Sequence, residues 1–330
     1  MIMRDIILSE CMDILMEHGY KVSQSFGRSC FDIIAKKDDF TIILKVLKNI
    51  DSFTMEQSNE LLKISYALNA LPLLIGIRTR NFQMENGIIY ERFHIKAITN
   101  ETFKSYLEGS PPIVYAGRGG FFVNIDGETL RKIRESLNIS IGELADYANV
   151  SRKTIYKYEQ NQANPSVEVA IKLEEYLNAP LVRSVNLYPE MTDFNLIQDK
   201  DKYDENTENN DFKKYVINIM DDLGFNIVET KKAPFDALIG IEDYDKEQEE
   251  IGRYYLKNIL LTNIDEKETE ETIKKANILN KISSIVDSYS LIILEEESDT
   301  KNLNHTTIIT VNDLEKMDDI VDLLYYIKKH

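Results

Sequence analysis

A short segment of the chain, SRKTIYK, gathers basic side chains and contains no acidic residue. It carries three cations and three uncharged polar side chains: Arg152, Lys153, Lys157, Ser151, Thr154 and Tyr156. Guanidinium and ammonium groups donate hydrogen bonds to phosphate oxygens and to the acceptor atoms on the major-groove edge of guanine. A helix that presents such groups along its outward face can lie in a DNA groove. The segment therefore predicts a contact with double-stranded DNA.

The residues around these cations predict two helices joined by a tight turn. Apolar residues repeat at helical spacing from Ile141, the pattern breaks near Asn149, and a second helix begins at Ser151. Asn tolerates the left-handed backbone that the turn requires, and the hydroxyl of a Ser N-cap accepts a hydrogen bond from the first turn. Ala145 is small where the two helices must approach closely. We expect the first turn of the second helix, Ser151 included, to face DNA.

A wider stretch, residues 127–178, predicts a small helical domain with a core of its own. Its apolar residues fall at helical spacing and can close one shared core. They are Leu130, Ile133, Leu137, Ile139, Leu144, Ile155, Tyr158, Leu173 and Leu177.

This stretch resembles the Cro/C1-type (XRE) helix-turn-helix family. The motif residues that carry the resemblance are Leu144-Ala145, Val150-Ser151, Ile155, Glu159 and Asn164-Pro165. The resemblance implies a lambda-repressor-like helical bundle in which Arg152, Lys153 and Lys157 read bases. It also implies an ion pair between Arg134 and Glu159. One position departs from the family, because Ile141 stands where the family has a phosphate-binding Gln.

The charge of the chain is unevenly distributed along its 330 residues. The formal net charge is -17, which by itself argues against a nucleic-acid partner. By count, however, residues 127–178 hold 7 basic and 8 acidic groups, whereas residues 211–330 hold 15 basic and 26 acidic groups, a net charge of -11. We expect the acidic C-terminal part to point away from DNA, and an acidic patch for a basic protein partner is the alternative for that part.

The segments on either side of the helical domain predict an internal duplication with a repeat of about 95 residues. Each segment shows the order α-β-β-β-α-β. Gly19 matches Gly224, Asp32 matches Asp236, and an Asn-Ile-Asp sequence closes the third strand of both. The second copy has an acidic insertion, DYDKEQEEIG, and the acidic stretch Asp199–Asp211 precedes it.

This order of elements resembles the restriction-endonuclease-like fold, and GYKVSQSFGRSCFDIIAKKDD is similar to archaeal Holliday-junction resolvases. The resemblance implies a divalent metal held by a Glu on the first helix, an Asp ending one strand and a Glu-x-Lys on the next. The N-terminal copy matches at Glu10, Asp32 and Lys45, but Ile43 replaces the Glu of Glu-x-Lys.

The C-terminal copy departs further from that pattern. It keeps Asp236, but Tyr215 replaces the helix Glu, and Tyr255 stands two residues before Lys257. Because an apolar Ile cannot coordinate a hard cation, we expect both copies to be catalytically inactive, with no bound metal.

The whole chain resembles a group of archaeal transcriptional regulators in which a Cro/C1 domain lies between non-catalytic domains. The resemblance implies an α/β plus all-α fold in five parts. They are a degenerate restriction-endonuclease-like domain (1–110), a linker (111–126), the helix-turn-helix domain (127–180), an acidic linker (181–210) and a second degenerate restriction-endonuclease-like domain (211–330).

We therefore predict a cytoplasmic, sequence-specific transcriptional regulator that binds double-stranded DNA, without a cofactor or a membrane segment. Since one helix-turn-helix reads one half-site, we expect a homodimer that pairs through the flanking domains. A contact with a protein of the transcription machinery stays open. The two alternatives are an adaptor whose Cro/C1 domain binds protein, and a metal-dependent, structure-selective DNA nuclease.

Overall fold

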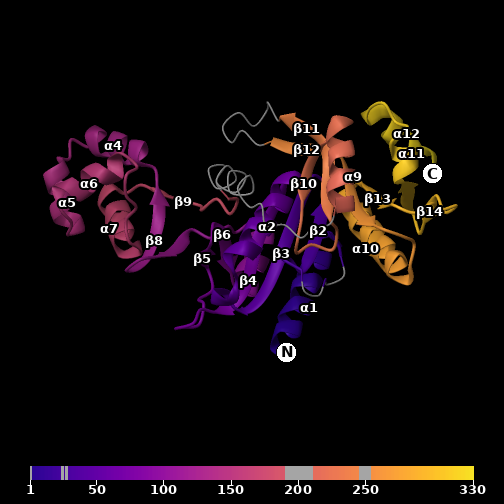
Figure 1. The fold of residues 1–330 in the computed structure, drawn as a ribbon. Coiled ribbons are helices and arrows are strands. Elements are labelled where there is room, and N and C mark those ends of the chain that lie inside the picture. The colour runs from indigo at the N-terminus through magenta and orange to yellow at the C-terminus, as the bar shows by residue number, and fades with distance from the viewer. Residues whose placement is uncertain (1, 24–25, 27–28, 190–210, 245–253) are drawn as a thin grey trace.

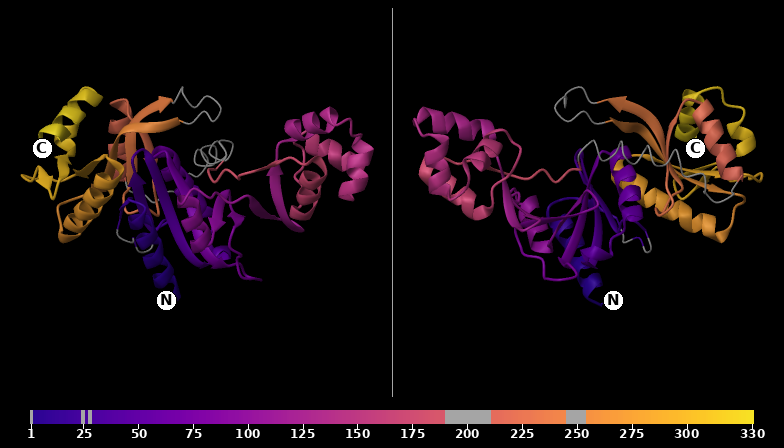
Figure 2. Two further views of the ribbon diagram at one scale, coloured as in Figure 1. Left: turned by 180° about the vertical axis from the view of Figure 1, so that it is seen from behind. Right: turned by 60° about the vertical axis from the view of Figure 1, so that its left-hand side comes forward.

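The computed structural model describes residues 2–23, 26, 29–189, 211–244 and 254–330. Two α/β units and one small helical domain make up the described chain (Figure 1). The helical domain lies at one end of the molecule, the C-terminal unit lies at the other, and the N-terminal unit lies between them (Figures 1 and 2). Residues 199–210 of the acidic stretch and most of the acidic insertion lie outside the described residues.

The N-terminal unit has the predicted order of elements and then extends it. Its elements are α1 (Ile2–Glu17), β1 (Lys21–Val22), β2 (Ile33–Lys37), β3 (Phe40–Asn49), the 3-10 turn η1 (Ile50–Ser52), α2 (Met55–Ala67), β4 (Ala70–Arg78), β5 (Ile88–Arg92), β6 (Ile95–Ile98) and α3 (Asn100–Leu107).

Strand β3 is central to this unit because both of its faces are buried. It pairs antiparallel with β2, where Leu44 faces Ile33, and parallel with β4, where Leu44 faces Leu73. Helices α1 and α3 pack on one face of the sheet, and α2 packs on the other. A strand covered on both faces reads as a continuous apolar run, which explains the sequence FTIILKVL.

The C-terminal unit repeats the order of elements of the N-terminal unit. Its elements are α9 (Asp211–Asp222), β10 (Asn226–Glu229), β11 (Ala237–Tyr244), β12 (Tyr254–Asp265), α10 (Glu270–Val286), β13 (Tyr289–Leu294), β14 (Asn302–Leu303), β15 (Thr306–Thr310), α11 (Val311–Leu314) and α12 (Ile320–Lys329). Its strands form a separate sheet in the order β10-β11-β12-β13-β15-β14.

The two α/β units share one apolar core. Phe31 of the N-terminal unit contacts Phe235 of the C-terminal unit, with ring centroids 6.5 Å apart, and both side chains are buried. Backbone contacts reinforce the junction, since Cys30 N donates to Lys232 O at 2.6 Å. The Glu60 carboxylate, at the buried face of α2, accepts from Lys231 N at 2.7 Å. The units therefore pair with each other within a single chain.

A β-hairpin and four helices make up the middle of the chain. They are β7 (Val114–Gly117), β8 (Gly120–Ile125), α4 (Gly127–Ser136), α5 (Ile141–Ala148), α6 (Arg152–Glu159) and α7 (Val167–Leu177), followed by β9 (Val182–Arg183). Residues 111–126, expected as a linker, thus contain two strands that continue the N-terminal sheet through the β5–β7 pairing. The first part of the expected acidic linker contains β9, which pairs with β8.

The helical domain has its own core, with one correction to the expected set. Leu130, Leu144, Ile155, Leu173 and Leu177 are buried in it. Leu137, by contrast, is 50% exposed. The physical reason is that α4 ends at Ser136 and the backbone turns into the left-handed region at the following Asn138, so the helical spacing does not extend to Leu137.

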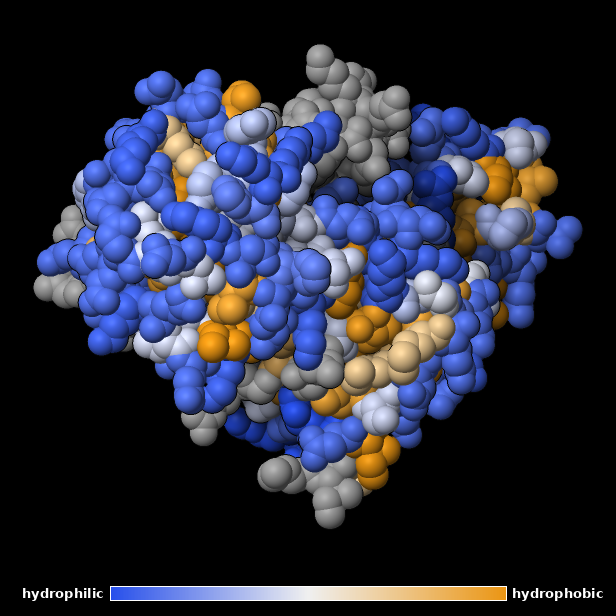
Figure 3. All heavy atoms as spheres, turned by 90° about the vertical axis from the view of Figure 1, so that its right-hand side faces the viewer, coloured by the Kyte–Doolittle hydropathy of each residue, from blue (hydrophilic) through white to orange (hydrophobic). Residues whose placement is uncertain are grey.

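The surface of the C-terminal end is mainly hydrophilic, with scattered hydrophobic side chains (Figure 3). Among the described helices, none combines the length and the apolar character needed to cross a membrane.

Candidate nucleic-acid interface

Helix α6 presents its basic residues on one exposed face. Arg152, Lys153, Tyr156 and Lys157 are exposed, whereas Ile155, Tyr158 and Glu159 on the opposite side are buried. This arrangement follows from the helical period, because residues four positions apart, such as Arg152 and Tyr156 or Lys153 and Lys157, lie on the same side of a helix. The structure therefore brings the predicted cations together on one solvent-accessible surface.

The first turn of α6 is organised by two hydroxyl groups. Ser151 is the N-cap, and its Oγ accepts from Thr154 N at 3.1 Å. The Ser151 and Thr154 hydroxyls also lie 2.8 Å apart, so one of them donates to the other. A mutual hydrogen bond uses only one of the two hydroxyl protons, and the second proton is available for a ligand oxygen.

The turn between α5 and α6 has the geometry that the sequence predicts. Asn149 caps α5 in the left-handed conformation, with φ 59°, and Val150 N donates to Ala145 O at 3.0 Å. Ala145 is almost completely buried, which agrees with the close approach of the two helices at that point.

Arg152 lies against the beginning of α5. A Cβ added to Gly142 would come within 2.9 Å of Arg152 Nε, so the guanidinium rests on the first turn of α5. The free N–H groups of a first helical turn carry a partial positive charge. Arg152 therefore places a positive charge at the N-terminal end of α5. Ile141, the first residue of that helix, has no polar group there.

The end of α6 is locked to the start of α4. Gly127 N donates to Asn161 Oδ1 at 2.9 Å, and a Cβ on Gly127 would lie 2.2 Å from Tyr158 O. Only glycine fits this contact. Hydrogen bonds from Thr129 lower the pKa of Asp126, the N-cap of α4, which also forms an ion pair with Arg183 of β9.

Arg134 and Glu159 form a buried, bidentate ion pair beneath α6. Arg134 Nε lies 2.5 Å from Glu159 Oε1, and Arg134 Nη2 lies 3.2 Å from Glu159 Oε2. A third hydrogen bond joins Arg134 Nη1 to Ile139 O at 3.0 Å. The hydrogen bonds to Glu159 raise the pKa of Arg134. The pair connects α4, the turn after it and the last turn of α6.

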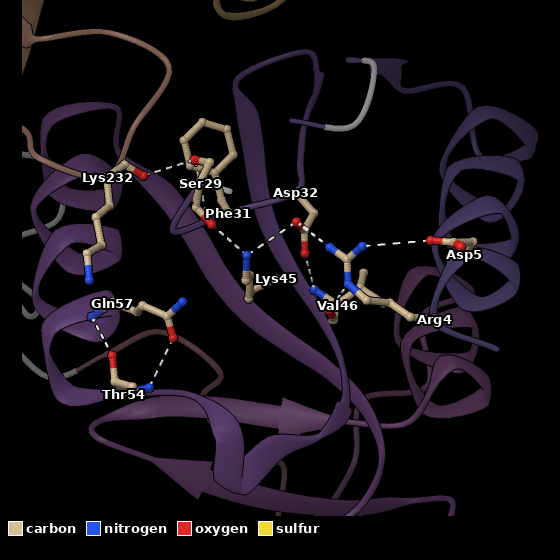
Figure 4. Close-up of polar contacts among 10 residues, drawn as sticks. All are labelled: Arg4, Asp5, Ser29, Phe31, Asp32, Lys45, Val46, Thr54, Gln57 and Lys232. Atoms are coloured by element: carbon tan, nitrogen blue, oxygen red, sulfur yellow. Dashed lines mark hydrogen bonds and ion pairs between the residues drawn. The ribbon is translucent and has the colours of Figure 1, made fainter. Parts of the chain in front are cut away.

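Asp32, which the N-terminal unit shares with the nuclease-like pattern, is bound by cationic side chains of the protein itself (Figure 4). Arg4 Nη2 of α1 lies 2.7 Å from Asp32 Oδ1, and Lys45 Nζ lies 3.3 Å from the same oxygen. The other oxygen, Asp32 Oδ2, accepts from Val46 N at 2.8 Å. Asp32 is fully buried, so these groups compensate its charge where solvent cannot.

The other nuclease-like positions of the N-terminal unit do not join Asp32. Glu10 is directed to α3, where its Oε2 accepts from Asn100 Nδ2 at 2.8 Å. Ile43 is fully buried in the core that the two α/β units share. Among the described residues, no group of three or more His, Cys, Asp and Glu side chains could hold a metal ion.

The C-terminal unit holds its equivalent aspartate in a similar way. Asp236 Oδ2 accepts from Ile264 N at 3.0 Å, as Asp32 accepts from Val46 N, and Lys213 Nζ of α9 lies 3.4 Å from Asp236 Oδ1. Tyr215 is not at this position, since its hydroxyl binds Glu315 at 2.5 Å.

The hydrogen bonds to the two aspartates correct the predicted register of the third strand. Asp32 N donates to Leu44 O, and Asp236 N donates to Thr262 O. Leu261 and Asn263 therefore correspond to Ile43 and Lys45, and the expected correspondence of Tyr255 and Lys257 is wrong by six residues along β12. The shared Asn-Ile-Asp sequence lies at different heights on β3 and β12, because Asn49 follows Leu44 by five residues and Asn263 follows Thr262 by one. Asn263 Oδ1 accepts from Asp236 N at 3.1 Å.

Sequence patterns did not reveal Arg4 as a partner of Asp32 or Gly142 as the support of Arg152. Both contacts join residues that belong to different elements, and neither has a local motif. Each unit has a cation near the beginning of its first helix, Arg4 or Lys213. This shared feature could have indicated that a protein cation pairs with the aspartate in place of a metal ion.

Replacing one partner of the Arg134–Glu159 pair should destabilise the helical domain. We expect Glu159→Ala and Arg134→Ala each to lower the free energy of unfolding by about 3 to 5 kcal/mol, because each removes the bidentate partner of a buried charge. Urea denaturation of the fragment 113–183, followed by circular dichroism, measures this. Lys132→Ala is the control, since Lys132 and Glu128 form a pair on the same helix that is about 70% exposed and should contribute little to stability. Losses below about 1 kcal/mol in both variants would contradict the prediction.

Two parts of the chain match known protein families. Residues 4–112 match the PD-(D/E)XK superfamily domain, and residues 130–183 match the helix-turn-helix family. Among solved structures, the restriction-modification controller protein C.AhdI from Aeromonas hydrophila is 28% identical. The match covers 16% of this chain and 82% of that protein, with a TM-score of 0.16.

Relatives that span nearly the whole chain come from archaea. A protein of Methanococcus vannielii is 52% identical over 99% of this chain and 98% of its own length. One from Methanocaldococcus jannaschii is 51% identical over 99% and 98%, and one from Pyrococcus furiosus is 37% identical over 94% and 93%. All three are named HTH-type transcriptional regulatory proteins, and this chain belongs to their family.

Proposed function

We propose that this protein regulates transcription by binding a specific double-stranded DNA sequence through α6. The exposed face formed by Arg152, Lys153, Tyr156 and Lys157 carries the proposal, together with the membership in a family named for this function. Such a protein binds DNA in the cytoplasm. A protein partner in the transcription machinery is compatible with this role.

The side chains of the interface divide between bases and backbone. Lys153, Tyr156 and Lys157 project from the exposed face of α6 and are assigned to base edges in the major groove. Arg152 rests on the first turn of α5, so it is assigned to a phosphate group, the contact that Ile141 cannot make. Ser151 and Thr154, whose paired hydroxyls retain one free proton, are assigned to a neighbouring phosphate.

Removing the cations of α6 should weaken DNA binding in two different ways. We expect Lys153→Ala and Lys157→Ala each to lose about 1 to 3 kcal/mol of binding free energy on the preferred sequence and to relax specificity. Arg152→Ala should weaken binding to all sequences alike and reduce the salt dependence. The preferred sequence comes from selection in a random DNA pool, and fluorescence anisotropy gives the affinities. Wild-type affinity in the triple Ala variant, folded by circular dichroism, would exclude α6 as the reader.

We also propose that two chains bind together, because one α6 reads only one half-site. The buried junction between the α/β units is formed within a chain, so it is not available for a second copy. The exposed ends of the C-terminal unit lie far from the helical domain in Figure 1, and pairing there would separate the two recognition helices. Exposed hydrophobic side chains of the helical domain, Leu137, Tyr147 and Ile171, support pairing through that domain instead.

Light scattering on the full chain and on the fragment 113–183 tests this arrangement. We expect both to be dimers, since the proposed contact surface lies in the fragment. A monomeric full chain would exclude the homodimer. A dimeric full chain with a monomeric fragment would place the contact on the α/β units, as the sequence predicts.

We infer that residues 211–330 are a second PD-(D/E)XK-type unit and that neither unit cleaves DNA. The shared order of elements and the matching backbone contacts of Asp32 and Asp236 support the first statement. The second rests on charge: Arg4 and Lys45 already neutralise Asp32, and Ile43 offers no oxygen to a cation. The match of residues 4–112 to the PD-(D/E)XK superfamily keeps a metal-dependent nuclease as the second candidate function.

Incubation with a four-way junction or a linear duplex should therefore yield no cleavage, in Mg²⁺ or in Mn²⁺. A divalent ion would have to displace the Arg4 guanidinium from the buried Asp32 carboxylate and break their ion pair. Gel electrophoresis of end-labelled DNA measures the outcome. Metal-dependent turnover that Asp32→Ala abolishes would replace the inactive assignment with the nuclease.

A further inference from the structure

The β7–β8 hairpin projects from the helical domain beside the region that follows α6. Its tip consists of Gly117, Arg118, Gly119 and Gly120, all exposed. Gly119 and Gly120 have φ values of 98° and 150°, a backbone that side chains rarely adopt. A Cβ at either of these two glycines would meet no atom within 4 Å. The tip is therefore narrow, open and shaped by glycine.

The hairpin is fixed to the loop between α6 and α7. Asn164 Nδ2 donates to Tyr115 Oη and to Asn124 Oδ1, both at 2.9 Å. Val123 N donates to Pro165 O at 3.1 Å, and Phe122 forms a β-bridge with Ser166. These contacts join both strands of the hairpin to the loop that leaves the recognition helix.

Packing inside the hairpin stiffens its approach to the tip. The rings of Tyr115 and Phe122 lie 6.0 Å apart on opposite strands, and a Cβ on Gly117 would come within 2.9 Å of the Phe122 ring. Cross-strand aromatic contacts of this kind stabilise a two-stranded hairpin. The position of the tip is thus set relative to α6.

Arg118 is the one charged residue between positions 109 and 125. It is exposed, and within the described parts of the chain it has no ion pair or hydrogen bond that engages its guanidinium. In a protein with a net charge of -17, a cation isolated from acidic neighbours on a rigid tip attracts an anionic partner.

We propose that the hairpin tip is a second DNA contact, in which Arg118 binds the phosphate backbone next to the base pairs read by α6. This inference rests on the proposed function. Residues 160–166 join the hairpin to the end of α6, so the proposed DNA contact extends from α6 across this loop to the tip. The glycines allow the backbone N–H groups of the tip to approach phosphate oxygens, because no side chain intervenes.

Arg118→Ala tests the proposal in the full chain, with Arg118→Lys to restore the charge and Lys132→Ala as an exposed cation elsewhere in the domain. Fluorescence anisotropy is measured on the selected duplex and on a mixed-sequence duplex of about 30 base pairs over a series of salt concentrations. Arg118→Ala should weaken binding about 3- to 10-fold on both duplexes and reduce the slope of log K against log salt by about 1. Arg118→Lys should recover most of the loss, and Lys132→Ala should match the wild type.

A hydroxyl-radical footprint locates the contact. The wild-type protein should protect backbone positions outside the base pairs that selection identifies, and Arg118→Ala should lose only those flanking positions. Asn164→Ala, which removes two hydrogen bonds that hold the hairpin without removing a charge, should weaken the same flanking protection. If Arg118→Ala binds with wild-type affinity, salt slope and footprint, the second contact is excluded while DNA binding through α6 stands. If the wild-type chain binds neither duplex, both the inference and the proposed function are overturned.

Discussion

The apolar core shared by the two α/β units is the constraint on which the rest of the molecule depends. Burial of apolar surface is the main favourable term in folding, and here the faces of two sheets supply it to each other. Ile43 lies inside this core. A carboxylate at that position would lose its hydration without gaining a partner, which costs several kcal/mol. The pairing of the units therefore favours an apolar residue at position 43, where a metal-dependent nuclease needs a carboxylate. At this position, stable packing of the two units and metal binding require different side chains.

The charge left behind by that change is compensated locally in both units. Asp32 and Asp236 each accept from a backbone N–H of the third strand and each face a cation from the first helix, Arg4 or Lys213. The two cations come from different turns of their helices, since Arg4 lies 15 residues before Gly19 and Lys213 lies 11 residues before Gly224. An aspartate that accepts a backbone hydrogen bond from the sheet and pairs with a cation of the helix connects the helix to the sheet. Its retention needs no catalytic role, because removing it would leave buried donors and a cation unpaired.

Local chemistry explains what could be predicted from the sequence. The N-cap at Ser151, the left-handed Asn149 and the apolar spacing around Ile155 are determined by neighbours in the chain, and the structure has all three features. Contacts between distant elements were not predictable. The Arg4–Asp32 pair spans 28 residues, and the hairpin before α4, which was expected as a linker, pairs with the distant strand β5. The predicted burial of Leu137 was wrong for a more local reason, since the end of a helix is set by the turn that follows it.

The arrangement of the three parts resolves the conflict between an acidic chain and an anionic ligand. The C-terminal unit holds most of the excess negative charge, and the N-terminal unit lies between it and the helical domain (Figure 1). Electrostatic repulsion between exposed charges is screened over about 8 to 10 Å at physiological salt. A whole domain is thicker than that, so the acidic residues have little effect at α6, where the local cations dominate. The strands β7, β8 and β9 that connect the helical domain to the N-terminal sheet thus have an electrostatic consequence as well as a structural one, because they hold the basic surface away from the acidic end of the same chain.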